Sequence, residues 1–123
     1  MSFFHYLFLG HFEHDGERTC FKKNPADSTY RPVVRRPLDA EAILAVLREV
    51  TGTKINDFAF PADWRIWMDD GYLVCDKYTR SRKEIDFVAR LVERTSCDIH
   101  DVAAHCDITL HDWLAVTRSY AQP

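Results

Sequence analysis

The chain lacks the short motifs that mark common enzyme sites. It contains no GxSxG, no HExxH and no glycine-rich phosphate loop. Only four of its 123 residues are glycines, which leaves the backbone little means of wrapping a nucleotide. No apolar run approaches the roughly 20 residues that a membrane-spanning helix needs. We therefore expect no enzyme, no cofactor and no membrane span.

An excess of basic residues is also missing. Lysine and arginine total 16 against 19 acidic residues, and the formal net charge is -3. A general nucleic-acid binder or a binder of anionic membranes shows a basic surplus, so the composition argues against both classes. The apolar N-terminal segment has neither a basic leader nor a small-residue cleavage site. We expect it to form a first strand rather than a signal peptide.

The four cysteines form no CxxC pair. Two of them lie on or beside apolar segments, and Cys75 is expected to point into the core, where a thiol is inert packing. A reduced, cytosolic setting is the simplest interpretation. Disulfide pairing is the alternative that an even number of cysteines leaves open.

The length and composition are those of one globular domain, with 46% hydrophobic and 28% charged residues. Apolar periodicity predicts a strand, a helix, a hairpin, a helix, a strand and a final helix. These elements cover residues 3–13, 38–51, 63–76, 81–96, 97–102 and 109–120. The order β-α-β-β-α-β with an added C-terminal helix predicts an α+β fold. Its antiparallel sheet of four to five strands is expected to be ferredoxin-like.

Capping residues mark the ends of the helices. Asp39 is a suitable N-cap for the first helix, and Gly52 is placed to end it. Ser81 and Glu84 form a capping box at the start of the second helix. Thr109 begins the third helix in a similar way.

An Asp-Gly pair near the N-terminus predicts an early hairpin. If Asp15 and Gly16 form its turn, residues 18–23 return as a partner strand with Glu13 opposite Arg18. With this strand the chain holds two successive ββα halves, and without it the ferredoxin-like order remains. Residues 24–37 contain three prolines, and we expect a loop there that leads into the first helix.

Residues 63–76 give the strongest local signal in the chain. Alternating residues run into Asp70-Gly71 and alternate again, which predicts a β-hairpin with these two residues in the turn. Counting outward from this turn places Met68 opposite Leu73, Ile66 opposite Cys75, Trp67 opposite Val74 and Arg65 opposite Asp76. One face of the hairpin is then apolar and consists of Trp64, Ile66, Met68, Leu73 and Cys75. The other, outer face carries Arg65, Trp67, Asp69, Tyr72, Val74 and Asp76.

The outer hairpin face is the main functional hypothesis. Trp67, Tyr72 and Arg65 give it the composition of interface hot spots. The competing prediction is that the C-terminal helix folds back and covers this face with its apolar side chains, which are Trp113, Leu114 and Tyr120.

A second hypothesis concerns the cysteines and histidines of residues 97–111, which are Cys97, His100, His105, Cys106 and His111. Structural zinc sites usually draw on tight ligand pairs. The one CxxH spacing joins Cys97 to His100, and these two would point to opposite faces of a strand, so we predict no metal site. An acid cluster of Asp98, Asp101 and Asp107 would need residues 97–107 to fold back. A small metal-binding or thiol-dependent enzyme using residues 97–111 is the alternative function.

The closing part of the chain carries a family resemblance. A capped helix ends at Glu93-Arg94-Thr95-Ser96, the strand Ile99-His100-Asp101 follows, and a helix capped by Thr109 comes after a short spacer. This pattern resembles the ending of small bacterial α+β proteins of the toxin-immunity type. The resemblance implies a protein that binds a cognate toxin and blocks its active site, and it implies no catalytic residues.

We therefore predict a cytosolic, non-catalytic domain that binds another protein, as an immunity-type inhibitor does. Such an inhibitor is expected to offer acidic and aromatic side chains to a basic toxin surface. The predicted partner-binding residues are Glu13, Asp15, Arg65, Trp67, Asp69, Asp70 and Tyr72. A homodimer that pairs open sheet faces is a third hypothesis.

Overall fold

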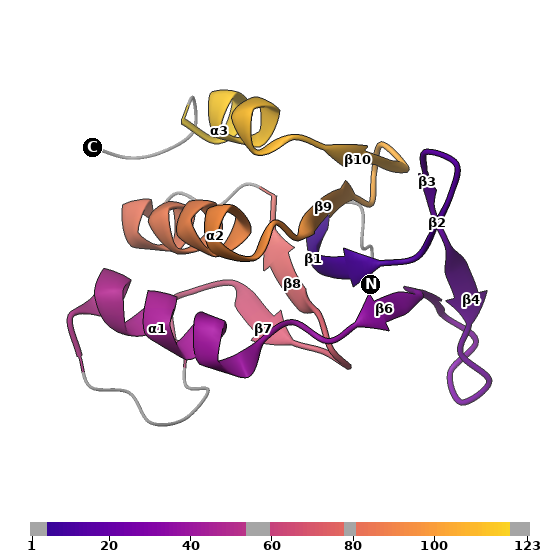
Figure 1. Ribbon diagram of the computed structural model, residues 1–123, viewed down its shortest axis with the longest axis horizontal. Coiled ribbons are helices and arrows are strands. Elements are labelled where there is room, and N and C mark those ends of the chain that lie inside the picture. The colour runs from indigo at the N-terminus through magenta and orange to yellow at the C-terminus, as the bar shows by residue number, and fades with distance from the viewer. Residues whose placement is uncertain (1–4, 54–59, 78–80, 119–123) are drawn as a thin grey trace.

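A computed structural model describes residues 5–53, 60–77 and 81–118. Three helices lie on one side of an antiparallel sheet, and small strands lie on the other side (Figure 1). The fold is α+β, as the sequence predicts. Within the described ranges, no helix has both the length and the apolar character needed to cross a membrane.

The first half of the chain is rich in short strands. It contains β1 (Tyr6–Phe12), β2 (His14–Asp15), β3 (Arg18–Thr19), β4 (Phe21–Lys23), β5 (Tyr30–Pro32), β6 (Val34–Arg36) and α1 (Ala40–Thr51). The second half contains β7 (Ile66–Met68), β8 (Leu73–Asp76), α2 (Arg82–Thr95), β9 (Asp98–Asp101), β10 (Cys106–Ile108) and α3 (Leu110–Arg118). Residues 14–32, from β2 to β5, form an arm outside the main sheet.

Strand β1 lies at the centre of the main sheet. The strand order is β10-β9-β1-β8-β7 with antiparallel neighbours, and β6 is the sixth strand because it pairs with the end of β1. All seven residues of β1 are buried. Leu7 and Leu9 face the helices and join the main core, whereas Tyr6 and Phe8 belong to a second apolar cluster on the outer face.

The helices cover one face of the sheet and end where the sequence predicts. The carboxylate of Asp39 accepts a hydrogen bond from the Glu41 backbone N–H, and Gly52 ends α1 with a φ of 71°. The Ser81 hydroxyl accepts from the Glu84 N–H, as expected for the capping box. Apolar side chains of α1, α2 and α3 meet the inner face of the sheet in the main core, among them Ile43, Val46, Phe87, Leu91 and Trp113.

The predicted register of the β7–β8 hairpin is confirmed. Met68 pairs with Leu73, Ile66 with Cys75 and Trp67 with Val74. Arg65 and Asp76 extend this pattern as an ion pair at 3.0 Å. Gly71 has a φ of 82°, a conformation that glycine adopts without steric cost, so the turn lies where the Asp-Gly pair places it.

The early hairpin forms, but its predicted register is wrong. His14 lies opposite Thr19 and Asp15 opposite Arg18, which moves the turn to Gly16 and Glu17. Gly16 has a φ of 62° and is now the first of the two turn residues. Two-residue hairpin turns need a positive φ at this position, which glycine adopts easily. Glu13 therefore faces Cys20, whose backbone N–H donates to the Glu13 carbonyl at 2.8 Å.

Residues 24–37 and 103–108, where no strand was predicted, contain strands. Residues 24–37 were expected to form a loop, yet β5 pairs with β4 and β6 pairs with β1. Residues 97–107 do fold back, because β10 pairs with β9 and sets Asp107 opposite His100. β5, β6 and β10 have three residues each and, unlike β7, no Asp-Gly turn beside them, so the sequence shows no hairpin pattern there.

The C-terminal helix does not cover the outer face. Trp113 of α3 packs in the main core on the helix side of the sheet, beside α2. The competing prediction for the outer face is therefore wrong for the described part of this helix, while Tyr120 lies outside the described residues.

We predict that Trp113→Ala lowers the free energy of unfolding by about 3–5 kcal/mol, the range for removing a buried aromatic side chain. Only 1% of the Trp113 surface is exposed. Val116→Ala on the same helix is the matched control, because Val116 is exposed and its loss should change stability by about 0.5 kcal/mol at most. Urea denaturation of both variants measures the difference, and equal effects would contradict this position of α3.

Candidate functional site

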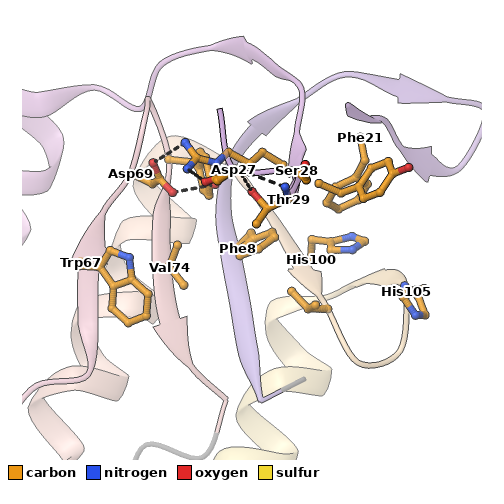
Figure 2. A pocket seen from close by; sticks show the side chains of 14 residues that line it. Phe8, Phe21, Asp27, Ser28, Thr29, Trp67, Asp69, Val74, His100 and His105 are labelled. Atoms are coloured by element: carbon orange, nitrogen blue, oxygen red, sulfur yellow. Dashed lines mark hydrogen bonds and ion pairs between the residues drawn. The ribbon is translucent and has the colours of Figure 1, made fainter. Parts of the chain in front are cut away.

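The outer face of the sheet carries a cavity of about 610 Å³. Its floor comes from the central strands, through Phe8 of β1 and Val74 of β8. Figure 2 shows Trp67 on one side of the cavity, and Phe21 and His100 on the other. The arm supplies a further wall with residues 27–31, the connection from β4 into β5.

Exposed aromatic side chains gather around this cavity. Phe21 is 38% exposed, Trp67 40% and Tyr30 69%, and all three line it. Within the described ranges, the remaining large apolar residue with comparable exposure is Val116 on α3. Exposed apolar surface that is concentrated at one place commonly marks a binding site.

The floor of the cavity is rigidly packed. Phe8 and Phe12 each meet the Tyr72 ring edge to face, at centroid distances of 5.4 and 5.8 Å. The Phe12 ring folds over Gly10, where a Cβ atom would lie 2.9 Å from the ring and 2.9 Å from the Tyr72 Cβ. Position 10 therefore needs glycine because a side chain would clash there, not because of its φ. The packing of the floor depends on this glycine.

Charged groups form one rim of the cavity and join the arm to the β7–β8 turn. Arg31 donates to Asp27 at 3.0 Å and forms an ion pair with Asp69 at 3.7 Å. The Tyr72 hydroxyl donates to Asp69 at 3.0 Å. Burial, together with the nearby Asp69 carboxylate, raises the pKa of Tyr72 above its usual range, so this hydroxyl keeps its proton and acts as a donor.

The structure divides the predicted partner-binding residues into two groups. Trp67, Asp69 and Tyr72 line the cavity, although Tyr72 is buried and serves as part of its floor. The others are exposed and lie outside the lining: Glu13, Asp15, Arg65 and Asp70. Arg65 pairs with the buried Asp76.

Sequence reasoning missed most of the arm's contribution. Phe21, Tyr30 and Arg31 lie in segments without apolar periodicity, so no local signal places them over the sheet. Phe8 could have been found, because alternation along the first strand puts it on the face opposite to Leu7 and Leu9.

A separate polar cluster lies where the arm meets β9 and β10. Its centre is the carboxylate of Asp107, which accepts hydrogen bonds from His14 at 2.7 Å, Thr19 at 2.7 Å and His100 at 2.9 Å. The second carboxylate is that of Asp98, with Oδ2 3.7 Å from the His14 Nε2. The acid cluster considered from sequence therefore forms from Asp98 and Asp107, while Asp101 pairs with Lys77 at 2.8 Å.

The charges of this polar cluster shift its pKa values. The hydrogen bond to Asp107 raises the pKa of His14 above its ordinary value of 6.5. Burial tends to raise the pKa of Asp107, but hydrogen bonds from Thr19, His100 and His14 outweigh it and lower that pKa. Asp107 is therefore an ionised acceptor, and each histidine nitrogen beside it must donate.

The four cysteines are free, and two of them are buried. Burial raises the pKa of Cys75 and of Cys97, so neither is a ready thiolate. Cys97 belongs to the main core, whereas the His100 ring lies against Phe21 on the outer face at 5.0 Å. The prediction that the side chains of Cys97 and His100 point to opposite faces is therefore confirmed.

Comparisons with protein-family models, with curated proteins and with solved structures give no match for this chain. The function must therefore be argued from the cavity, from the polar cluster and from the chemistry of their residues.

We predict that, in metal-free protein, the pKa of His14 lies above 6.5 and the pKa of His11 lies below it. The carboxylate of Asp107 favours protonated His14, so this pair stabilises the fold fully below pH 6.5 and ceases to do so as the pH rises through the raised pKa. Burial, then Arg36 and Arg35, lower the pKa of His11. NMR titration of the imidazole protons in EDTA measures both midpoints.

The variant Asp107→Asn should return the His14 midpoint toward 6.5, because it removes the ionised acceptor. The exposed Asp112→Asn is the control and should leave the His14 midpoint unchanged. A wild-type His14 midpoint at or below 6.5 would contradict the described cluster.

Proposed function

We propose that this chain is a non-catalytic protein-binding domain that receives an apolar side chain of its partner in the outer-face cavity. The observation that carries this proposal is the gathering of Phe21, Tyr30 and Trp67 around one cavity. Aromatic residues beside an arginine, here Arg31, are the composition of binding hot spots.

The size of the cavity favours an anchoring side chain. Its volume of about 610 Å³ falls within the range of cavities that bury small ligands, and one aromatic or large aliphatic side chain fits inside it with neighbouring backbone. The floor residues Phe8, Tyr72 and Val74 are buried and mutually packed in the free protein. Because these side chains are already ordered, binding costs little further conformational entropy.

The charged rim favours a basic group next to the anchor. Asp27 and Asp69 both contact the single guanidinium of Arg31, which leaves one negative charge in excess among these three residues. A lysine or arginine beside the partner's apolar residue is complementary to this rim. The proposed partner surface is thus a large apolar residue flanked by a basic one.

The immunity-type hypothesis adds the identity of the partner, a toxin domain whose active site the chain blocks. The charged rim supports it, because its excess negative charge suits a basic toxin surface. The ferredoxin-like interpretation of the sheet is a further proposal. The order β9-β1-β8-β7 supports it, since β1 and β7 both run antiparallel to β8 between them.

The alternative of a thiol-dependent enzyme at residues 97–111 gains no support from the described residues. Cys97 is buried in the main core. Cys106 is exposed but lies next to Asp107 along β10, so their side chains point to opposite faces. The polar cluster around Asp107 thus gives this thiol no base.

A selection of displayed random peptides on the immobilised protein tests the proposed function. We expect enriched peptides to combine a large apolar residue with a lysine or arginine. Tyr30→Ala and Trp67→Ala should each weaken their binding roughly 30-fold, about 2 kcal/mol, as loss of a hot-spot residue does. Tyr30 is 69% and Trp67 40% exposed, and neither belongs to a buried core cluster, so the variants should fold. Fluorescence anisotropy of labelled peptides measures the affinities.

The matched control is Val116→Ala, which removes exposed apolar surface on α3, away from the cavity lining. It should leave peptide affinity unchanged. Failure to select any peptide, or equal binding by all variants, would overturn the proposal. A homodimer through the same face would instead appear as concentration-dependent sedimentation that Trp67→Ala abolishes.

A further inference from the structure

The polar cluster between the arm and the β9–β10 hairpin has the composition of a metal site. One ligand atom from each of His14, Asp98 and Asp107 lies within 4.8 Å of the others. Within the described ranges, no other group of three metal-ligating side chains lies this close together. The residues come from β2, β9 and β10, so the tertiary fold alone brings them together.

The separations between these atoms fit a single small cation. Tetrahedral ligands at zinc distances of about 2.0–2.2 Å lie roughly 3.3–3.6 Å from one another. The His14 Nε2 is 2.7 Å from Asp107 Oδ2 and 3.7 Å from Asp98 Oδ2. The distance to Asp98 is near the tetrahedral separation, whereas the distance to Asp107 is that of a hydrogen bond. An ion that replaces the shared proton therefore needs His14 and Asp107 to move apart by about 1 Å or a little less.

Neighbouring groups hold the two carboxylates in position. Thr19 and His100 both donate to Oδ1 of Asp107, which leaves Oδ2 facing His14. The Phe12 backbone N–H donates to Asp98 Oδ2 at 3.2 Å. Hydrogen-bonded partners that orient the carboxylate ligands are a regular feature of metal sites in proteins.

The polar cluster is open to solvent on one side. The side chains of His14, Asp98 and Asp107 are 28%, 32% and 27% exposed, which allows an ion to enter. Three protein ligands leave a fourth tetrahedral position for water. One imidazole with two carboxylates suits Zn²⁺ or a similar transition-metal ion, whereas Ca²⁺ and Mg²⁺ prefer six or more oxygen ligands.

We propose that His14, Asp98 and Asp107 bind one divalent cation of the zinc type, with His100 as a positioning residue for Asp107. The ion would join β2 of the arm to β9 and β10, and so fix the arm beside the cavity. His100 connects the two features, because its ring lines the cavity while its Nδ1 bonds Asp107.

Calorimetric titration of EDTA-treated protein with Zn²⁺ tests this proposal. We expect one ion per chain, and with Co²⁺ the visible absorption of a four-coordinate site. His14→Ala and Asp98→Asn remove direct ligands, so each should weaken binding by more than the roughly 10- to 100-fold that loss of an outer hydrogen-bond partner costs. Asn at position 98 keeps an acceptor for the Phe12 N–H, which protects the fold.

Matched controls are His111→Ala and Asp112→Asn, both exposed on α3, and they should bind Zn²⁺ as the wild type does. His100→Phe keeps a ring against Phe21 but loses the bond to Asp107, so it should retain the stoichiometry at lower affinity. Far-UV circular dichroism checks that each variant is folded.

Three results would overturn the proposal. The first is no binding at millimolar Zn²⁺, and the second is unchanged affinity in His14→Ala and Asp98→Asn. The third is loss of binding in Cys20→Ser or Cys106→Ser with normal binding in His14→Ala, which would place the ion on thiols instead. Peptide binding is measured separately, so failure here leaves the proposed function standing.

Discussion

Burial of β1 on both of its faces is the constraint on which the rest of the structure depends. All seven residues from Tyr6 to Phe12 are buried, with strands paired on both edges. The helices cover the face of Leu7 and Leu9, so the face of Tyr6 and Phe8 needs a cover of its own. The arm covers part of it through Phe21, and the uncovered part is the cavity beside Trp67.

The parts of the fold that sequence could predict are those set by nearby residues. The β7–β8 register follows from alternation around Gly71, and the helix ends follow from Asp39, Ser81 and Gly52. β5, β6 and β10 were missed, because each has only three residues and, unlike β7, none lies beside an Asp-Gly turn. The early hairpin was found with the wrong register because a glycine can occupy either turn position.

The functional features depend more on long-range contacts. Trp67 and Asp69 could be placed on the outer face from the hairpin alone, but Tyr72 proved to be buried floor. The polar cluster joins His14 to Asp107, which is 93 residues away in the sequence, and no local sequence pattern predicts such a contact. His100 belongs to both features, because its ring lines the cavity and its Nδ1 bonds Asp107.

The central claim is that the sheet face around Trp67 is open in the free protein. Iodide quenching of tryptophan fluorescence tests it directly, because Trp64 and Trp113 are buried whereas Trp67 is 40% exposed. One quenchable fraction is predicted in the wild type, and it should disappear in Trp67→Phe. A wild-type protein whose tryptophan emission resists iodide, or a quenchable fraction that survives in Trp67→Phe, would contradict the claim.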